Sequence, residues 1–190
     1  MKAETVVALA ILSIAPSFGQ LPDDLKRKFD EAERRIVRLQ PAAFPDLPGN
    51  VVRELQRRGC TIPQEAYTKK PHNVIKGQFA KPGQTDWAVL CSVGGSSSIL
   101  VFWNGSEKNP ADLAKMEDRN YLQGITTDEI RYSRGIRAAG GDFIIRHYKA
   151  YGGPTPPPID HDGIDDAYIE KASVTHYYEH GKWLRFIGAD

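Results

Sequence analysis

Residues 85–103 read TDWAVLCSVGGSSSILVFW, and this stretch decides the fold that we expect. Its two segments, 87–91 and 99–103, are apolar at every position, so each is expected to form a strand that is buried on both faces. Gly94 and Gly95, which lie between the segments, are typical of the tight turn of a β-hairpin. The stretch therefore predicts a central antiparallel hairpin that is covered on both sides.

Further strands are expected around this hairpin, because β-branched, aromatic or alternating apolar residues recur along the chain. Gly140-Gly141 and His180-Gly181 are typical of hairpin turns, and residues 151–158 are rich in Gly and Pro and predict a loop. Asn109-Pro110 predicts the start of one short helix within residues 107–124. The other predicted strands are 73–79, 129–138, 142–148, 174–179 and 182–187.

Two helices are predicted ahead of the strands. Apolar residues recur at steps of three and four over residues 23–39, and Pro and Gly frame a shorter helix over residues 48–58. Together these elements predict an α+β fold in which two N-terminal helices pack on a largely antiparallel sheet of six to eight strands. The helical part is expected over residues 20–58 and the β-rich part over residues 72–190.

The first nineteen residues have the pattern of a secretory signal peptide. A weakly charged start is followed by a short apolar run, and Ser17 and Gly19 place small residues before a cleavage site at Gln20. The run is shorter than the roughly 20 apolar residues that span a bilayer. The alternative is a buried N-terminal helix. We expect residues 1–19 to be removed and residues 20–190 to form a single secreted or periplasmic domain.

Two cysteines, Cys60 and Cys91, are the only ones in the chain. An even number of cysteines in an exported protein predicts a disulfide bond, and the alternative is a pair of buried free thiols. Because Cys60 follows the second predicted helix directly, the bond would fasten the end of that helix to the central hairpin.

The charge of the chain excludes some classes of partner. There are 25 Lys and Arg residues against 24 Asp and Glu residues, for a formal net charge of +1. This balance gives no signature of nucleic-acid or polybasic membrane binding, and no later apolar stretch is long enough to span a membrane. The expected partner is an unidentified protein or glycan.

An acidic loop, DHDGIDD at residues 160–166, is the sharpest local motif. It resembles the D-x-D-G-I-x-D core of the calcium loops in type-3 thrombospondin repeats, which implies calcium ligation by Asp160, Asp162 and Asp166. The resemblance is incomplete, since Pro158 and Ile169 stand where further acidic residues are expected. Calcium takes six to eight oxygens, and the alternative is an Asx-rich turn that enters a strand.

Histidines suggest two further hypotheses. His176 to His180 reads H-x-x-E-H, the inverted zinc-peptidase pattern, but this pattern needs a helix and the segment is predicted to be a strand. On a strand the two histidines would stand about 13 Å apart, which is too far for one zinc ion. His147, His161 and Asp162 are the candidates for an acid–base or transition-metal site, as in a hydrolase-like enzyme.

Aromatic residues near the C-terminus are candidates for a binding surface. Tyr177, Tyr178 and Trp183 lie on the last predicted hairpin, where they could stack on a sugar or on a partner chain. The alternative is that they form core and cross-strand pairs.

Two resemblances cover more of the chain. Residues 77–90 resemble one FG-GAP-type repeat of β-propellers, but Ala80-Lys81-Pro82 replaces the calcium-binding acids and no further copy occurs. The segments 59–64, 86–92, 181–183 and 188–190 together are similar to a family of uncharacterised exported bacterial proteins, which implies export and a common fold but no activity.

No motif meets the geometry of a known catalytic site. The sequence therefore favours a non-catalytic binding or accessory module outside the cytosol. The alternatives are a hydrolase-like enzyme that uses the histidines near the acidic loop, and a structural module that calcium stabilises.

Overall fold

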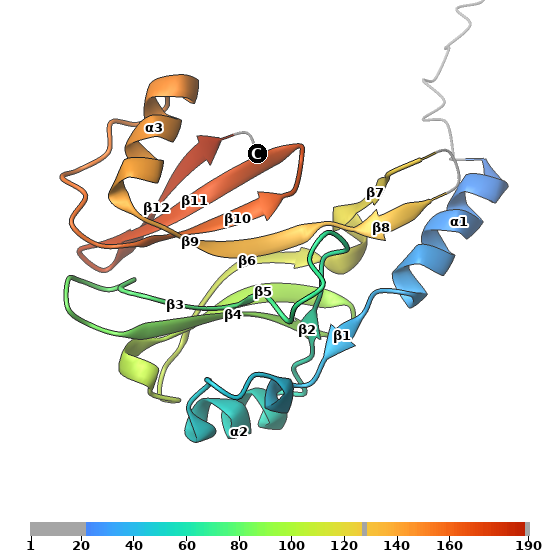
Figure 1. Ribbon diagram of the computed structural model, residues 1–190, viewed down its shortest axis with the longest axis horizontal. Helices are drawn as coiled ribbons and strands as arrows, with labels where there is room; N and C mark the ends of the chain where they lie inside the picture. The colour runs from blue at the N-terminus through green and yellow to red at the C-terminus, as the bar shows by residue number, and fades with distance from the viewer. Residues whose placement is uncertain (1–21, 127–128, 189–190) are drawn as a thin grey trace, which may run out of the picture.

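The computed structural model describes residues 22–126 and 129–188. The predicted signal peptide, residues 1–19, lies outside these ranges. Within them the chain forms twelve strands in four antiparallel sheets, together with three α-helices (Figure 1). None of the helices in the described part of the chain is long and apolar enough to cross a membrane.

The first sheet is a meander of four consecutive strands, and it contains the central hairpin. Gly94 and Gly95 both have positive φ and join Val93 to Ser96 in a two-residue turn, as predicted. The strands follow the order β3 (Val74–Gly77), β4 (Asp86–Val93), β5 (Ser96–Phe102) and β6 (Ala111–Glu117).

The second sheet is also a meander, and it ends in the predicted C-terminal hairpin. His180 and Gly181 have positive φ and form the turn between Glu179 and Lys182. A helix, α3 (Gly141–Tyr151), connects the first two strands. The strands are β9 (Arg134–Ala139), β10 (Gly163–Tyr168), β11 (Ala172–Glu179) and β12 (Lys182–Gly188).

Smaller elements surround the two sheets. Two two-stranded sheets pair β1 with β2 and β7 with β8. The bounds are α1 (Asp23–Arg34), β1 (Arg38–Leu39), α2 (Gly49–Arg57), β2 (Ile62–Pro63), β7 (Leu122–Gly124) and β8 (Ile130–Tyr132), with short 3₁₀ turns at Pro41–Ala43, Trp103–Gly105 and Asp118–Tyr121.

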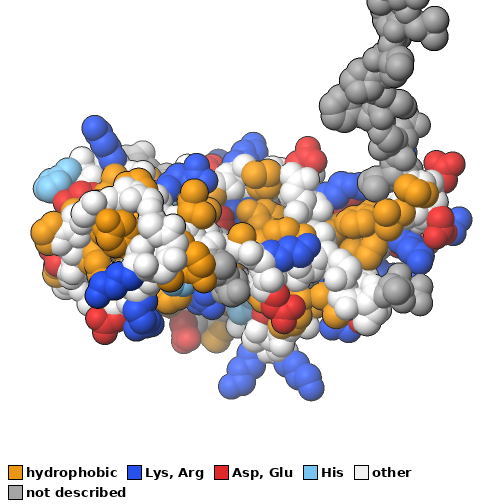
Figure 2. Space-filling view, turned by 90° about the horizontal axis from the view of Figure 1, so that it is seen from above, with side chains coloured by type: hydrophobic (Ala, Val, Ile, Leu, Met, Phe, Trp, Pro, Cys, Tyr) orange, Lys and Arg blue, Asp and Glu red, His pale blue; other side chains and the backbone are white. Residues whose placement is uncertain are grey.

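The two main sheets pack face to face, and a helix covers each outer face (Figure 1). On β4, the side chains of Ala88 and Leu90 point between the sheets, whereas Val89 and Cys91 point toward α2. This alternation explains why the segment is apolar at every position. On the other outer face, Ile144 of α3 packs against the second sheet. Acidic and basic side chains are interspersed on the face that carries α3 (Figure 2).

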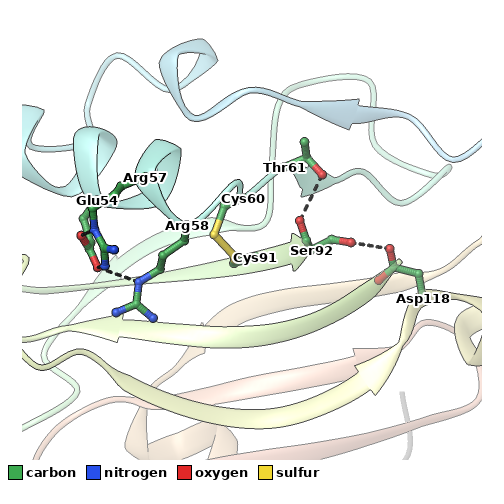
Figure 3. The surroundings of a disulfide bond; sticks show 8 residues. All are labelled: Glu54, Arg57, Arg58, Cys60, Thr61, Cys91, Ser92 and Asp118. Atoms are coloured by element: carbon green, nitrogen blue, oxygen red, sulfur yellow. Dashed lines mark hydrogen bonds and ion pairs between the residues drawn. A yellow bond between two sulfur atoms is a disulfide. The ribbon is translucent and has the colours of Figure 1, made fainter. Parts of the chain in front are cut away.

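The disulfide between Cys60 and Cys91 is present, with the two Cα atoms 5.2 Å apart (Figure 3). Gly59, with a φ of +72°, ends α2, so that the Cys60 N–H donates to the Leu55 carbonyl in a Schellman-type cap. Thr61 then pairs with Ser92, next to Cys91 on β4. The prediction that the bond fastens the second helix to the central hairpin is confirmed.

The predicted arrangement of two N-terminal helices on one sheet of six to eight strands is wrong. The described strands divide between two stacked sheets and two small ones. Of the two N-terminal helices, only α2 packs on a main sheet, while α1 packs through Ala32 and Ile36 on the small sheet of β7 and β8. The central strands are indeed covered on both faces, but one of the covering layers is a second sheet rather than a helix.

Three predicted elements also differ. Residues 142–148 form part of α3 and not a strand, because Phe143, His147 and Tyr151 recur at four-residue steps and share one helix face. No helix forms within residues 107–124 apart from the short 3₁₀ turn, since β6 pairs with the edge of β5. The first helix ends at Arg34 rather than at residue 39, because Arg38 and Leu39 pair with β2.

Candidate functional site

A pocket of about 530 Å³ lies between the two main sheets, at the side of β6 and β12. We call it the inter-sheet pocket. The edge strand β6 is irregular here: its pairing with β5 shifts between Ser97 and Ile99, and Ala114 has a φ of +54°. Such bulges bend an edge strand and are frequent beside functional sites. The residues that line it include Leu113, Lys115, Tyr121, Asp166, Tyr168, Val174, His176, Trp183 and Arg185.

The inner end of the pocket is built on a buried ion pair that joins the sheets. The Arg134 guanidinium donates to both oxygens of Asp166, at 2.9 and 2.8 Å. It also donates to the carbonyl and hydroxyl of Ser97 and to the Ala114 carbonyl that the bulge turns inward. These bonds use all five N–H donors of the arginine, and its face lies over the Tyr121 ring.

This ion pair is stable as a charged pair. Burial alone would lower the pKa of the Arg134 guanidinium, but the bonded Asp166 carboxylate outweighs burial and the net shift is upward. For the Tyr121 hydroxyl, whose charged form is an anion, burial raises the pKa, and the negative charge of Asp166 raises it further. Arg134 and Asp166 therefore satisfy each other's charge and hydrogen bonds, and the guanidinium has no N–H donor left for a ligand.

His176 lines the pocket and lacks such a partner. Its side chain is 6% exposed, and its Nε2 lies 4.0 Å from Asp166 Oδ2, beyond hydrogen-bond distance. Nε2 is buried and has no hydrogen-bond partner within the described residues. Burial lowers the pKa of His176 to about 4 although Asp166 opposes this shift, so the imidazole is neutral at pH 7. His176 therefore contributes an unused hydrogen-bonding atom just beneath the wall of the pocket.

Aromatic rings form much of the pocket wall. Trp183 lines the pocket and stacks on Trp103, with ring centroids 5.9 Å apart, and Tyr178 packs against both rings. On the opposite side, Tyr121 and Tyr168 meet edge to face at 5.4 Å. The polar inner end is thus surrounded by flat apolar surfaces.

Of the three predicted aromatic binding residues, the structure places one in this pocket. Trp183 lines it, and Tyr178 lies behind Trp183. Tyr177 is fully buried on the other face of the sheet, where it packs with Ile144 of α3. Neighbouring residues of a strand point to opposite faces, so Tyr177 and Tyr178 cannot serve one surface.

The predicted catalytic candidates have separate structural partners. The Nε2 atom of His161 donates to the Tyr178 carbonyl at 2.8 Å, and its Nδ1 lies 2.6 Å from Asp160 Oδ1 and 2.9 Å from the Tyr177 hydroxyl. Both ring nitrogens are therefore used within the protein. Asp162 accepts a hydrogen bond from the backbone N–H of Gln78 at 2.9 Å, which ties the acidic loop to the chain just after β3.

His147 lies on α3, with its ring centroid 4.0 Å from that of Phe143. Its Nδ1 and the hydroxyl of Ser173 both flank Gly188, and both atoms are buried without a hydrogen-bond partner among the described residues. The backbone of Gly188 leaves room for the ring, because a Cβ there would stand 2.3 Å from Nδ1. His147 thus fills the space between α3 and the end of β12.

The predicted calcium ligands are not gathered in one place. Asp160 and Asp162 line a shallow hollow of about 190 Å³ beside Gln78, but Asp166 is bound to Arg134 between the sheets. The His161 imidazole holds the pKa of the Asp160 carboxyl below its usual range. Within the described residues, no group of three or more His, Cys, Asp or Glu side chains could hold a metal ion. Two carboxylates with protein donors fall short of the six to eight oxygens of a calcium site.

The H-x-x-E-H segment lies on β11 and its turn, as predicted. His176 is buried between the sheets, whereas the His180 side chain is 91% exposed beside Glu179. The two imidazoles therefore lie in different environments and do not form the pair of ligands that a zinc peptidase requires.

Comparisons with protein-family models, with curated proteins and with solved structures found no match to this chain. The similarity to exported bacterial proteins and the two local resemblances therefore stay predictions. The geometry of the inter-sheet pocket is the evidence on which a function can be argued.

Proposed function

We propose that this protein is a non-catalytic binding module that holds a small, largely apolar ligand in the inter-sheet pocket. The observation that carries the proposal is a pocket of about 530 Å³ lined by His176, whose buried Nε2 has no hydrogen-bond partner among the described residues. Ligand pockets have volumes of roughly 300–1,000 Å³, mostly apolar walls and a few polar groups that orient the ligand. The inter-sheet pocket has each of these properties.

A binding role fits the chemistry of the pocket better than catalysis. Acid–base catalysis needs a base within hydrogen-bond reach of a nucleophile or of a second titratable group. His176 is 4.0 Å from Asp166, and that carboxylate is already bound twice by Arg134. His161, one of the predicted catalytic candidates, offers no ring nitrogen to a substrate.

Export is part of the same proposal. The leader pattern of residues 1–19 and the disulfide between Cys60 and Cys91 both suit an oxidising compartment outside the cytosol. Mass spectrometry of the exported product tests this, with a mature N-terminus at Gln20 expected and an intact leader contradicting it.

Binding can be tested with N-phenyl-1-naphthylamine, a neutral apolar dye whose fluorescence rises in apolar sites. The purified protein should bind one dye molecule per chain. Val174→Trp fills the pocket and should weaken binding at least tenfold. The matched control is Ile187→Trp: Ile187 faces Val174 across the β11–β12 pair, is 70% exposed and does not line the pocket.

The control variant should bind the dye as the parent protein does. Circular dichroism and a melting curve establish that both variants are folded. The proposal is overturned if the parent protein does not bind the dye, or if both tryptophan variants bind it equally well.

A further inference from the structure

We propose that the ligand of the inter-sheet pocket is an anionic amphiphile whose single carboxylate lies between Lys115 and Arg185 while its apolar body lies between the sheets. This inference rests on the proposed function of the pocket. It concerns the charge and shape of the occupant, which the pocket volume alone does not define.

Two cations reach the rim of the pocket from opposite sheets. Lys115 is on β6 of the first sheet and Arg185 is on β12 of the second, and both are exposed residues that line the pocket. Neither forms an ion pair with a carboxylate of the described residues. Arg185 is the cross-strand neighbour of His176, so the rim charge and the unused Nε2 belong to the same side of the pocket.

The remaining charges at the pocket do not offset these two cations. Asp166 is the one acidic residue that lines it, and Arg134 neutralises that carboxylate through two hydrogen bonds. His176 is uncharged at pH 7. The pocket therefore carries a net excess of two positive charges, both at the rim. An anionic group is favoured there and a cationic group is repelled.

The distribution of polarity along the pocket gives the shape of the ligand. The exposed cations lie at the rim, and the half-buried side chains of Leu113, Val174 and Trp183 form apolar walls. A ligand that satisfies both regions has a charged head and an apolar body, as a fatty acid does. One carboxylate with two oxygens matches one ammonium and one guanidinium through charge-assisted hydrogen bonds.

The test uses three probes with the same twelve-carbon chain and different heads. Dodecanoate, 1-dodecanol and dodecyltrimethylammonium are each titrated below their micelle concentration against the naphthylamine dye bound to the parent protein. Dodecanoate should displace the dye at a concentration at least tenfold lower than either of the others. Raising the salt concentration should weaken dodecanoate selectively, because the rim cations are exposed.

Variants locate the head group. The double variant Lys115→Gln/Arg185→Gln should lose at least tenfold in affinity for dodecanoate and should keep its affinity for dodecanol. The control is Lys182→Gln, which removes an exposed cation from the same strand, β12, outside the pocket. The double charge reversal Lys115→Glu/Arg185→Glu should reverse the order of dodecanoate and dodecyltrimethylammonium.

The two proposals fail in different ways. If dodecanol or the ammonium compound competes as well as dodecanoate, or if none of the three displaces a dye that does bind, the anionic ligand is ruled out and the pocket remains a binding site. If the dye itself does not bind the parent protein, the proposed function fails, and this inference fails with it.

Discussion

The imidazole of His176 titrates differently in the folded and the unfolded chain. Burial lowers the pKa of His176 to about 4 in the folded protein, against its ordinary value of 6.5. Between pH 6.5 and pH 4 the unfolded chain therefore binds a proton that the folded chain does not. Above pH 6.5 the difference has no effect. As the pH falls below 6.5, it lowers the free energy of unfolding, by about 3 kcal/mol at pH 4.

We predict that His176→Phe removes this part of the pH dependence. The free energy of unfolding, measured by urea denaturation at pH 7 and pH 4.5, should fall less in the variant than in the parent protein. His180→Asn is the control, since His180 is exposed in a turn with a φ of +47° that Asn tolerates. Equal pH dependence in the parent protein and in His176→Phe would contradict the burial that lowers this pKa.

The structural roles of single residues were only partly predictable from the sequence. Asp166 and His176 were both named, but they were placed in calcium and zinc motifs because those motifs are local patterns. The partner that defines Asp166 is Arg134, 32 residues earlier in the chain. A signal was present, because Arg134 falls between Tyr132 and Ile136 on the apolar face of the alternating segment 129–138, where a cation is expected to be buried. The carboxylate that binds it could not be identified without the pairing of β9 with β10.

At the scale of elements, the disulfide is the covalent part of the contact between α2 and the first sheet. It closes a loop across a sequence separation of 31 residues. We predict that Cys60→Ala/Cys91→Ala lowers the free energy of unfolding by roughly 3–4 kcal/mol, because the unfolded chain gains loop entropy. Urea denaturation of the parent protein and the variant measures this difference.

A reducing agent provides the control for this prediction. Dithiothreitol should lower the stability of the parent protein to that of the variant and should leave the variant unchanged. A parent protein that is equally stable when fully reduced would show that the helix is held by packing alone, through Val51 and Leu55 in the core with Phe102.

Elements whose signal is local were predicted well. The hairpin at Gly94-Gly95 and the helix that ends before Gly59 each have their turn or cap chemistry within a few residues. The predictions for residues 107–124 and 142–148 were wrong because tertiary contacts decide their structure. The strand β6 forms against the free edge of β5, and α3 forms over the second sheet. Short segments with mixed periodicity depend on such partners.

At the scale of the whole molecule, Arg134 joins the two main sheets. It lies on β9 of the second sheet and donates to Ser97 of β5 and Ala114 of β6 in the first. We predict that Asp166→Asn destabilises the protein by about 3–5 kcal/mol, because it leaves a buried guanidinium without its counter-charge. Urea unfolding followed by tryptophan fluorescence and by circular dichroism measures the loss.

An exposed ion pair gives the matched comparison. Arg131→Gln breaks the pair with Glu129, whose side chain is 43% exposed, and should cost less than about 1 kcal/mol. The double variant Arg134→Met/Asp166→Leu should recover part of the loss, since it removes both buried charges. If Asp166→Asn costs no more than Arg131→Gln, the ion pair does not join the sheets energetically.

The stacking of the sheets was the feature that the sequence did not reveal. The apolar pattern of β4 and β5 shows that both faces are covered, but it does not distinguish a covering helix from a covering sheet. The inter-sheet pocket depends on this stacking, so its residues come from β6, from the 3₁₀ turn Asp118–Tyr121 and from three strands of the second sheet. The lining residues come from separate short segments spread over residues 113–185, so no local motif marks the site.

Both main sheets are meanders, in which every hydrogen-bonded neighbour is also the next strand along the chain. Their contact order is therefore low for a sandwich of strands, and a low contact order favours rapid folding. Each sheet can therefore form its own hydrogen bonds without waiting for the strands of the other sheet. The last step of folding is then the packing of the two preformed sheets against each other.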